Sequence, residues 1–297
     1  MPWDSLKLND GMTRTNSSGS NSYGTWRTGK GQPPVDSLKQ AFAAGIHHVD
    51  TAQNYTNEPE AGIAIRESGI PREQIFVTTK WSRLNGLDIA TSFQNSLKNL
   101  GLSYIDLYLI HGAELCDDIP KCWKEMEKIK DSGLARQPIF FLFLFFRHSN
   151  DFGLIYYRSI GVSNFEVQDL QQLLAISKHV PVVNQILFHP YVYEEQLPIL
   201  KLCAEKSIVI EAYSPLIPVT KRPGGPVDKP VSQVAQRLGV SMDQVLLAWA
   251  KAKGTVPVTM SAKKERVKGY VKAGDLVLSS ADIDAIDKAG AKGVNAN

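Results

Sequence analysis

Short runs of β-branched residues alternate with helix-length amphipathic segments along almost the whole chain. The expected strands are 23–26, 47–51, 75–80, 105–111, 159–162, 182–185, 207–212 and 255–258. The expected helices are 35–44, 58–67, 88–100, 119–131, 167–177, 194–206, 227–238, 242–252 and 263–271. Such alternation predicts parallel strands joined by crossover helices. Eight strand–helix units in 297 residues fit an α/β fold of the closed (β/α)8 TIM-barrel type.

The rival architecture is an open, doubly wound sheet. A dinucleotide-binding sheet of that kind usually carries a G-x-G-x-x-G loop after its first strand. Here Gly29-Lys30-Gly31 has no third glycine at the right offset. Because α/β barrels run to about 250 residues as one unit, the length does not require two domains. We therefore expect a single barrel domain over residues 1–297.

Charge and cysteine content narrow the possible partners. Lys and Arg total 33 against 30 Asp and Glu, a net charge of +3, which is too small to predict nucleic-acid binding. The start, residues 1–4, has no basic region followed by an apolar core, so we expect no signal peptide and a cytoplasmic protein. Cys116, Cys122 and Cys203 lack metal-ligand spacing, so we expect free, buried thiols.

No metal site is expected from the histidines either. His47, His48 and His189 have no partner at metal-ligand spacing, and we interpret them as structural.

Polar residues stand at the ends of three consecutive expected strands. Asp50, Lys80 and His111 occupy these ends, and Tyr55 follows shortly after the first. In an α/β barrel the C-terminal ends of the strands form the active face. Each residue alone is an ordinary surface or strand-end residue, but together they suit proton transfer to a carbonyl oxygen. A lysine ammonium favours the tyrosine anion, an aspartate balances the lysine, and a histidine can orient the substrate oxygen.

Six motifs in barrel order carry a resemblance to a known family. They are GIHHVDTAQNYTNE (45–58), FVTTK (76–80), LYLIH (107–111), GVSNF (161–165), NQ (184–185) and EAYSPL (211–216). Together they resemble the aldo-keto reductases, from about Leu6 to Gly293. The stretches GTWR, GQPPVDSLKQA, NQILFHPYVY and PGGPVDKPV are similar to a fungal branch that reduces aldehydes, ketoesters and ketoamides.

The resemblance implies a catalytic tetrad and a cofactor. The tetrad falls on Asp50, Tyr55, Lys80 and His111, with the tyrosine as general acid, and the hydride comes from a nicotinamide cofactor. The implied cofactor contacts are Ser163, Asn164, Gln185, Tyr213, Ser214, Leu216, Ser261 and Arg266. Tyr213 matches the aromatic residue that stacks on the nicotinamide ring.

Two regions of the implied site depart from the family pattern. Met260 occupies the place of a lysine that usually contacts the cofactor 2′-phosphate, and Lys263 and Lys264 can compensate, so we favour NADPH. Trp26 and Trp81 match pocket aromatics, and His111 also contacts substrate. The residues at 112–114 replace a Ser/Trp-Pro pair, which changes this wall of the pocket.

Two segments interrupt the family pattern outside the site. Residues 137–158 include the apolar octet 139–146, and without them the chain reads GLAR-SIGVSNF, a helix end running into strand five. Either this segment is a true insertion that docks on a partner or membrane, or it is a gene-model artefact. An octet is too short to cross a bilayer. Residues 12–22 are polar where relatives have an apolar strand, so we expect a first strand that is short or poorly packed, and difficulty in closing the barrel.

The sequence therefore predicts an NADPH-dependent oxidoreductase that reduces aldehydes or ketones, and possible substrates include ketoesters and ketoamides. The alternative is a catalytically impaired barrel that acts as a cofactor-binding or regulatory subunit. A further rival is a membrane-associated protein that uses 139–146. We expect a small-molecule carbonyl substrate, no nucleic acid, no membrane, and a monomer or weak homodimer.

Overall fold

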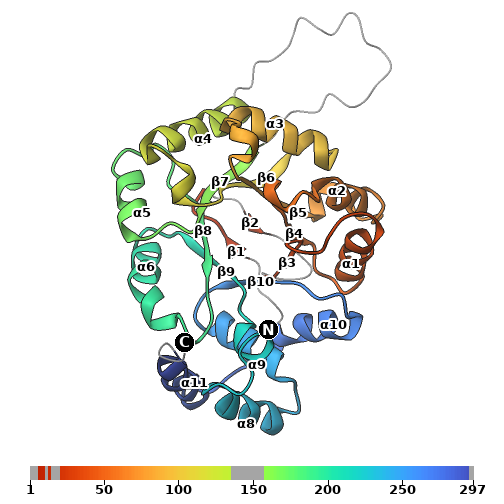
Figure 1. Cartoon of the computed structure of the whole chain (residues 1–297), viewed down its shortest axis with the longest axis vertical. Helices are drawn as coiled ribbons and strands as arrows, with labels where there is room; N and C mark the ends of the chain where they lie inside the picture. Colours follow the sequence, from red (N-terminus) through yellow and green to blue (C-terminus); the bar gives the residue numbers. More distant parts are fainter. Residues whose placement is uncertain (1–5, 11–12, 15–20, 135–156, 294–297) are drawn as a thin grey trace, which may run out of the picture.

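The computed structural model describes residues 6–10, 13–14, 21–134 and 157–293. Eight parallel strands close into a barrel in the order β10-β3-β4-β5-β6-β7-β8-β9, with the helices around the outside (Figure 1). The strands are β3 (Ser22–Gly24), β4 (His48–Asp50), β5 (Phe76–Trp81), β6 (Ile105–Ile110), β7 (Tyr157–Ser163), β8 (Val183–Leu187), β9 (Val209–Tyr213) and β10 (Val256–Thr259). The predicted (β/α)8 barrel is confirmed.

The helices match the expected segments within a few residues. They are α1 (Gln32–Ala43), α2 (Glu58–Arg66), α3 (Ile89–Leu100), α4 (Ile119–Leu134), α5 (Val167–Leu174), α6 (Tyr193–Glu205), α8 (Asp228–Leu238), α9 (Met242–Ala252) and α10 (Lys264–Lys272). The sequence reasoning missed the short α7 (Ile217–Thr220), the C-terminal α11 (Ser280–Gly293), and an N-terminal hairpin of β1 (Leu6–Lys7) and β2 (Thr13–Arg14).

Helix α3 shows why these segments fold as they do. Asp88 is its N-cap and accepts a hydrogen bond from the Thr91 N–H at 2.8 Å, which satisfies one of the free donors of the first turn. Gly101 ends the helix with φ 62°, a left-handed conformation that favours glycine. Between these caps, residues such as Phe93 and Leu97 are buried against the barrel. The helix is therefore defined locally and stabilised by packing.

The first barrel strand is short, as predicted, but it is well packed. All three residues of β3 are buried, and β3 pairs with both β4 and β10, so the barrel closes. The strand is short, one of the two expected alternatives, whereas the expected difficulty in closing the barrel was wrong. The physical reason is that Tyr23, now 1% exposed, fills the interface and donates its hydroxyl to the Ser261 carbonyl at 2.9 Å. Residues 12 and 15–20 of the polar segment lie outside the described residues.

The described residues between the two strands of the N-terminal hairpin pack against one end of the barrel. Leu8 is 2% exposed and packs in a cluster with Leu107, Leu109 and Val183. Nearby, Asp10 accepts hydrogen bonds from Lys130 Nζ and Ser159 Oγ, both at 2.8 Å. Ser159 lies near the start of β7. Leu8 and Asp10 therefore lie at the N-terminal end of the barrel, away from the strand ends that carry the tetrad.

The predicted insertion lies almost wholly outside the described residues. Its positions 137–156 are not described, whereas Tyr157 and Arg158 already belong to β7. Strand β7 therefore begins two residues earlier than expected. Among the helices of the described ranges, none is long and apolar enough to cross a membrane.

The expectation of three free thiols was wrong. Cys116 and Cys122 form a disulfide, with their Cα atoms 6.1 Å apart, and only Cys203 is a free, buried thiol. The 3-10 turn η4 (Ala113–Leu115) reverses the chain after β6, which brings Cys116 next to the first turn of α4. Local chain reversal, which spacing alone does not reveal, makes the pairing possible. We call this pair the rim disulfide.

Candidate active site

A cavity of about 700 Å³ opens at the C-terminal ends of the strands. All eight implied cofactor contacts line it, and so do Asp50, Tyr55, His111 and Trp26. These residues come from positions 26 to 266 in the chain, and the barrel brings them together because every strand ends on the same face. The cavity therefore joins the predicted tetrad and the predicted cofactor residues in one site.

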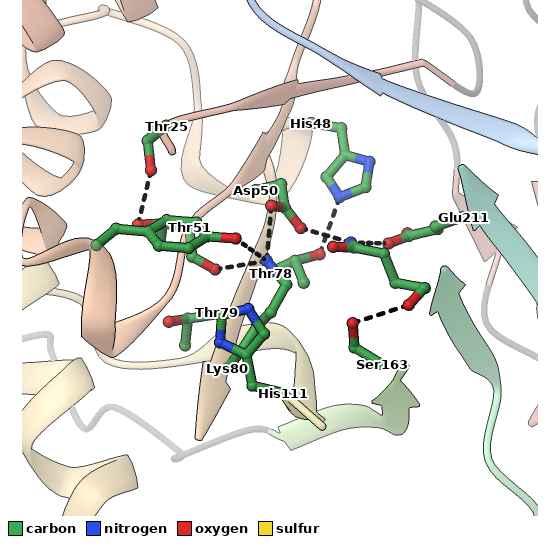
Figure 2. A network of polar contacts seen from close by, with 12 residues as sticks. Thr25, His48, Asp50, Thr51, Thr78, Thr79, Lys80, His111, Ser163 and Glu211 are labelled. Carbon is green, nitrogen blue, oxygen red and sulfur yellow. Dashed lines mark hydrogen bonds and ion pairs between the residues drawn. The ribbon is translucent and has the colours of Figure 1, made fainter. Parts of the chain in front are cut away.

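Lys80 and Asp50 form a buried ion pair at the base of this site. Lys80 Nζ lies 2.7 Å from Asp50 Oδ1, 3.0 Å from the Thr51 carbonyl and 3.4 Å from the Tyr55 hydroxyl. Lys80 is 0% exposed and Asp50 is 2% exposed, and Figure 2 shows the lysine between its partners. The ammonium is therefore hydrogen-bonded to both the aspartate and the tyrosine, as the sequence predicted.

The electrostatics of the tetrad combine burial with these contacts. Burial raises the pKa of Tyr55, and the nearby Lys80 ammonium offsets part of that rise. Burial also raises the pKa of Asp50, again opposed by Lys80. Burial alone would lower the pKa of Lys80, but the negative charge of Asp50, joined by that of Tyr55 once it ionises at high pH, outweighs burial, so the pKa is raised. Lys80 is therefore charged and Tyr55 protonated at neutral pH.

His111 follows β6 and faces the tyrosine. The two rings are 5.6 Å apart in an edge-to-face arrangement, and His111 Nδ1 lies 2.8 Å from Ser82 Oγ. Burial, assisted by the Lys80 charge, lowers the pKa of His111 to about 3. The imidazole is therefore neutral. When the Ser82 hydroxyl donates to Nδ1, the remaining N–H is on Nε2 and can donate to a substrate oxygen.

A second group of polar residues lines the same cavity next to the tetrad. Asn164 accepts a hydrogen bond from the Tyr213 hydroxyl at 2.9 Å and donates to the His111 carbonyl at 2.9 Å. Asn164 and Ser214 both have positive φ, at 55° and 57°, immediately after β7 and β9. Non-glycine residues rarely adopt this conformation, and they concentrate at functional sites. These contacts tie the implied cofactor residues to the tetrad.

Glu211 is a site residue that the sequence reasoning missed. It is 0% exposed in β9 and accepts a hydrogen bond from Gln185 Nε2 at 2.7 Å. The same Nε2 donates to Asp50 Oδ2 at 2.8 Å. A signal was present in the sequence, because residues two apart in a strand share a face. Tyr213 was expected to face the cavity, so Glu211 had to point inward as well.

The implied 2′-phosphate end carries several cations. Ser261 and Lys263 line the cavity with Arg266, whose Nε lies 3.1 Å from Asp243 Oδ2. Met260, at the position of the usual lysine, also lines the cavity and is 40% exposed. Lys264 begins α10 beside them. The donors available here are cationic and hydroxyl groups, which fit a phosphate.

The two tryptophans expected in the substrate pocket differ in position. Trp26 lines the cavity and is 44% exposed, with the Arg27 guanidinium 4.2 Å from its ring. Trp81 is 5% exposed, and its Nε1 donates to the Leu87 carbonyl at 3.0 Å. Trp81 adjoins Lys80 in β5, so the alternation of side chains turns it away from the barrel interior.

The part of the pocket wall that follows His111 differs from the family pattern at residues 112–114. Exposed Glu114 folds back over Gly112 there, so that a Cβ at Gly112 would meet the carboxylate.

Metal binding is not suggested in this part of the chain or elsewhere within the described ranges, where no three His, Cys, Asp or Glu side chains could hold an ion.

Comparisons with known proteins decide the family. The profile described as "Aldo/keto reductase family" matches residues 22–138 and 145–291. The chain belongs to this family. The match breaks at 139–144, within the apolar octet that the sequence reasoning singled out. The suspected family membership is thereby confirmed.

Individual relatives of this aldo/keto reductase agree with that result. The NAD/NADP-dependent indole-3-acetaldehyde reductase of Schizosaccharomyces pombe is 37% identical over 260 residues, covering 86% of this chain and 84% of the relative. The NADPH-dependent alpha-keto amide reductase of Saccharomyces cerevisiae is 32% identical over 263 residues, covering 83% and 75%. The structure of a Bombyx mori aldo-keto reductase in complex with NADP superposes with a TM-score of 0.79 at 29% identity, covering 97% and 93%.

These findings confirm the predicted class of reaction. The aldo/keto reductase described here is an oxidoreductase that reduces carbonyl groups of small molecules, and NADPH is its cofactor. The alternative of a catalytically impaired subunit finds no support among the described residues, where the expected tetrad is assembled.

Proposed function

We propose that this enzyme reduces aldehydes and activated ketones, including ketoesters and ketoamides, with Tyr55 as general acid. The substrate class is supported by the names of the relatives, among them an aldehyde reductase and an alpha-keto amide reductase. The observation that carries the proposal is the Lys80 ammonium, bonded to Asp50 at 2.7 Å and to the Tyr55 hydroxyl at 3.4 Å. Tyr55 therefore holds its proton in the resting enzyme, and the Lys80 ammonium stabilises the phenolate that forms when the proton passes to the substrate oxygen.

Each tetrad residue has one task in this proposal. Tyr55 donates its hydroxyl proton to the carbonyl oxygen as negative charge develops there. Lys80 stabilises the phenolate that remains, and Asp50 keeps Lys80 charged and in place. The neutral His111 donates from Nε2 to the same oxygen and fixes its direction. NADPH, when bound, supplies the hydride to the carbonyl carbon.

Other residues of the cavity supply the cofactor contacts. We propose that Asn164, Ser163 and Gln185 hold the nicotinamide carboxamide and that Tyr213 stacks on its ring. Ser214 and Leu216 hold the pyrophosphate, and Ser261, Arg266 and Lys263 hold the 2′-phosphate. All of these residues line the same cavity as Tyr55, which supports the assignment. Trp26, which lines the mouth of the cavity, contacts substrate.

The remaining proposals concern the protein as a whole. We propose a cytoplasmic monomer or weak homodimer that binds neither nucleic acid nor membranes. Residues 1–297 form one barrel domain, and residues 137–158 interrupt the family pattern as an insertion. The break in the family match at 139–144 supports this reading.

The test is the Tyr55→Phe variant. We expect loss of carbonyl reduction by a factor of about 10² to 10⁴, the usual contribution of a general acid. NADPH should still quench the intrinsic tryptophan fluorescence, because Tyr55 is not among the proposed cofactor contacts. Reduction of an aldehyde and ketoester panel at the wild-type rate by this variant would refute the proposed role.

A further inference from the structure

The aldo/keto reductase carries a second buried acid beneath its tetrad. Glu211 lies in the middle of β9, is 0% exposed, and pairs in register with Gln185 of β8. Neighbours in register share a face of the sheet, so both side chains project into the barrel. Figure 2 shows Glu211 on the side of Asp50 opposite from His111. A buried carboxylate is costly unless hydrogen-bonded or paired, so its place here requires a partner group.

One amide nitrogen joins the two carboxylates. Gln185 Nε2 donates to Asp50 Oδ2 at 2.8 Å and to Glu211 Oε2 at 2.7 Å. Both protons of the amide are engaged, and an ionised carboxylate can only accept. The side chain therefore cannot turn over, because that would place Oε1 against two negatively charged groups. Only Oε1 is left to face the cavity that Gln185 lines.

The charged side chains around the Gln185 amide are buried and lie close together. The side-chain partners of the amide are Asp50 and Glu211, and Asp50 in turn bonds the Lys80 ammonium, which lies 3.4 Å from the Tyr55 hydroxyl. The negative charge of Glu211 raises the pKa of Lys80, although burial opposes it, and adds to the burial that raises the pKa of Asp50. Glu211 thus acts on the tetrad through Asp50 and Lys80, without touching Tyr55.

We propose that Glu211 is a positioning residue: it fixes the Gln185 amide so that Oε1 is presented to the cofactor, and its charge sets the alkaline limit of activity. The proposal rests on the assigned roles of Tyr55 and Gln185. Without the glutamate charge, the pKa of Lys80 would be raised less, so the ammonium that supports Tyr55 would be lost at lower pH. Without the Glu211 carboxylate, only Asp50 would oppose inversion of the Gln185 amide, so its orientation would be held less strictly.

The experiment compares Glu211→Gln with a matched control, Glu58→Gln. Glu58 is also buried, at 2% exposed, and accepts hydrogen bonds from Thr79 Oγ1 at 2.8 Å and Asn99 Nδ2 at 3.1 Å, outside the tetrad. For Glu211→Gln we expect KM for NADPH to rise about tenfold, the effect of one hydrogen bond to a charged group. The alkaline limb of the kcat/KM profile should move to lower pH. Glu58→Gln should change neither quantity.

A second variant separates orientation from charge. Glu211→Asp keeps the charge but shortens the side chain, so KM for NADPH should rise while the alkaline limb stays in place. This variant also serves if Glu211→Gln does not fold. Wild-type KM and pH profile in the Glu211 variants, with Tyr55→Phe inactive, would overturn this inference and leave the proposed function intact. Full activity of Tyr55→Phe would refute the proposed function itself.

Discussion

Removal of the Lys80 ammonium should destabilise the whole barrel as well as stop the reaction. Lys80 is 0% exposed and Asp50 2% exposed, with 2.7 Å between their charged atoms. Replacing one partner of such a pair leaves the other charge buried and unpaired, which costs about 3–5 kcal/mol. Gln185 still donates to Asp50 in the variant, so we expect Lys80→Met to fall near the lower end of that range.

The prediction has a pH dependence with a definite sign. Burial raises the pKa of Asp50 above its ordinary value, and loss of Lys80 removes the main group that opposes this rise. A carboxyl with a raised pKa favours the folded state when it is protonated, and that contribution is lost as the pH rises through the folded-state pKa. The destabilisation by Lys80→Met should therefore be larger at pH 7 than at pH 5.

Urea unfolding at both pH values measures the effect, with Asp50→Asn and the double variant completing a cycle. The double variant should recover part of the loss, because it contains no unpaired carboxylate. A cost below about 1 kcal/mol for Lys80→Met at pH 7, or a double variant as unstable as the sum of the two single variants, would refute the electrostatic reasoning.

Three further predictions follow from other parts of the chain. Burial lowers the pKa of His189 to about 4, so the enzyme should lose stability as the pH falls from about 6.5, and His189→Phe should show a smaller loss between pH 7 and 4.5 in urea unfolding, by up to about 1.4 kcal/mol per pH unit. A thiol reagent should titrate one group, Cys203, in the denatured unreduced chain and three after reduction; three before reduction would contradict the rim disulfide. Deletion of 137–156 should raise soluble yield and preserve kcat/KM, since an uncharged apolar octet promotes aggregation, and loss of activity without better yield would oppose it.

Much of the site could be predicted because it sits at strand ends. Asp50, Lys80 and His111 end or follow consecutive strands, and the barrel places such positions on one rim regardless of detailed packing. The alternation of side chains along a strand could also have predicted the orientation of two further residues. It turns Trp81 away from the side that Lys80 occupies, and it turns Glu211 to the side of Tyr213.

Features that depend on packing could not be predicted in this way. The first strand was expected to be short or poorly packed because residues 12–22 are polar; it is short, but Tyr23 and its neighbours are buried between β4 and β10. The rim disulfide depends on a chain reversal at η4 that spacing does not encode. The closed barrel sets the contacts of the first strand, whereas the disulfide depends on the local path of the chain between residues six apart.

The sequence by itself determined the barrel, the family and the rim that carries the tetrad, because hydrophobic periodicity and strand ends are local properties of the chain. The tertiary structure decided which side chains form hydrogen bonds and ion pairs with one another. Gln185 reaches Asp50 across 135 residues of sequence and Glu211 across 26, and Lys80 becomes fully buried between Asp50 and Tyr55. Hydrogen bonding and burial depend on distances of a few ångströms, which only the closed fold defines.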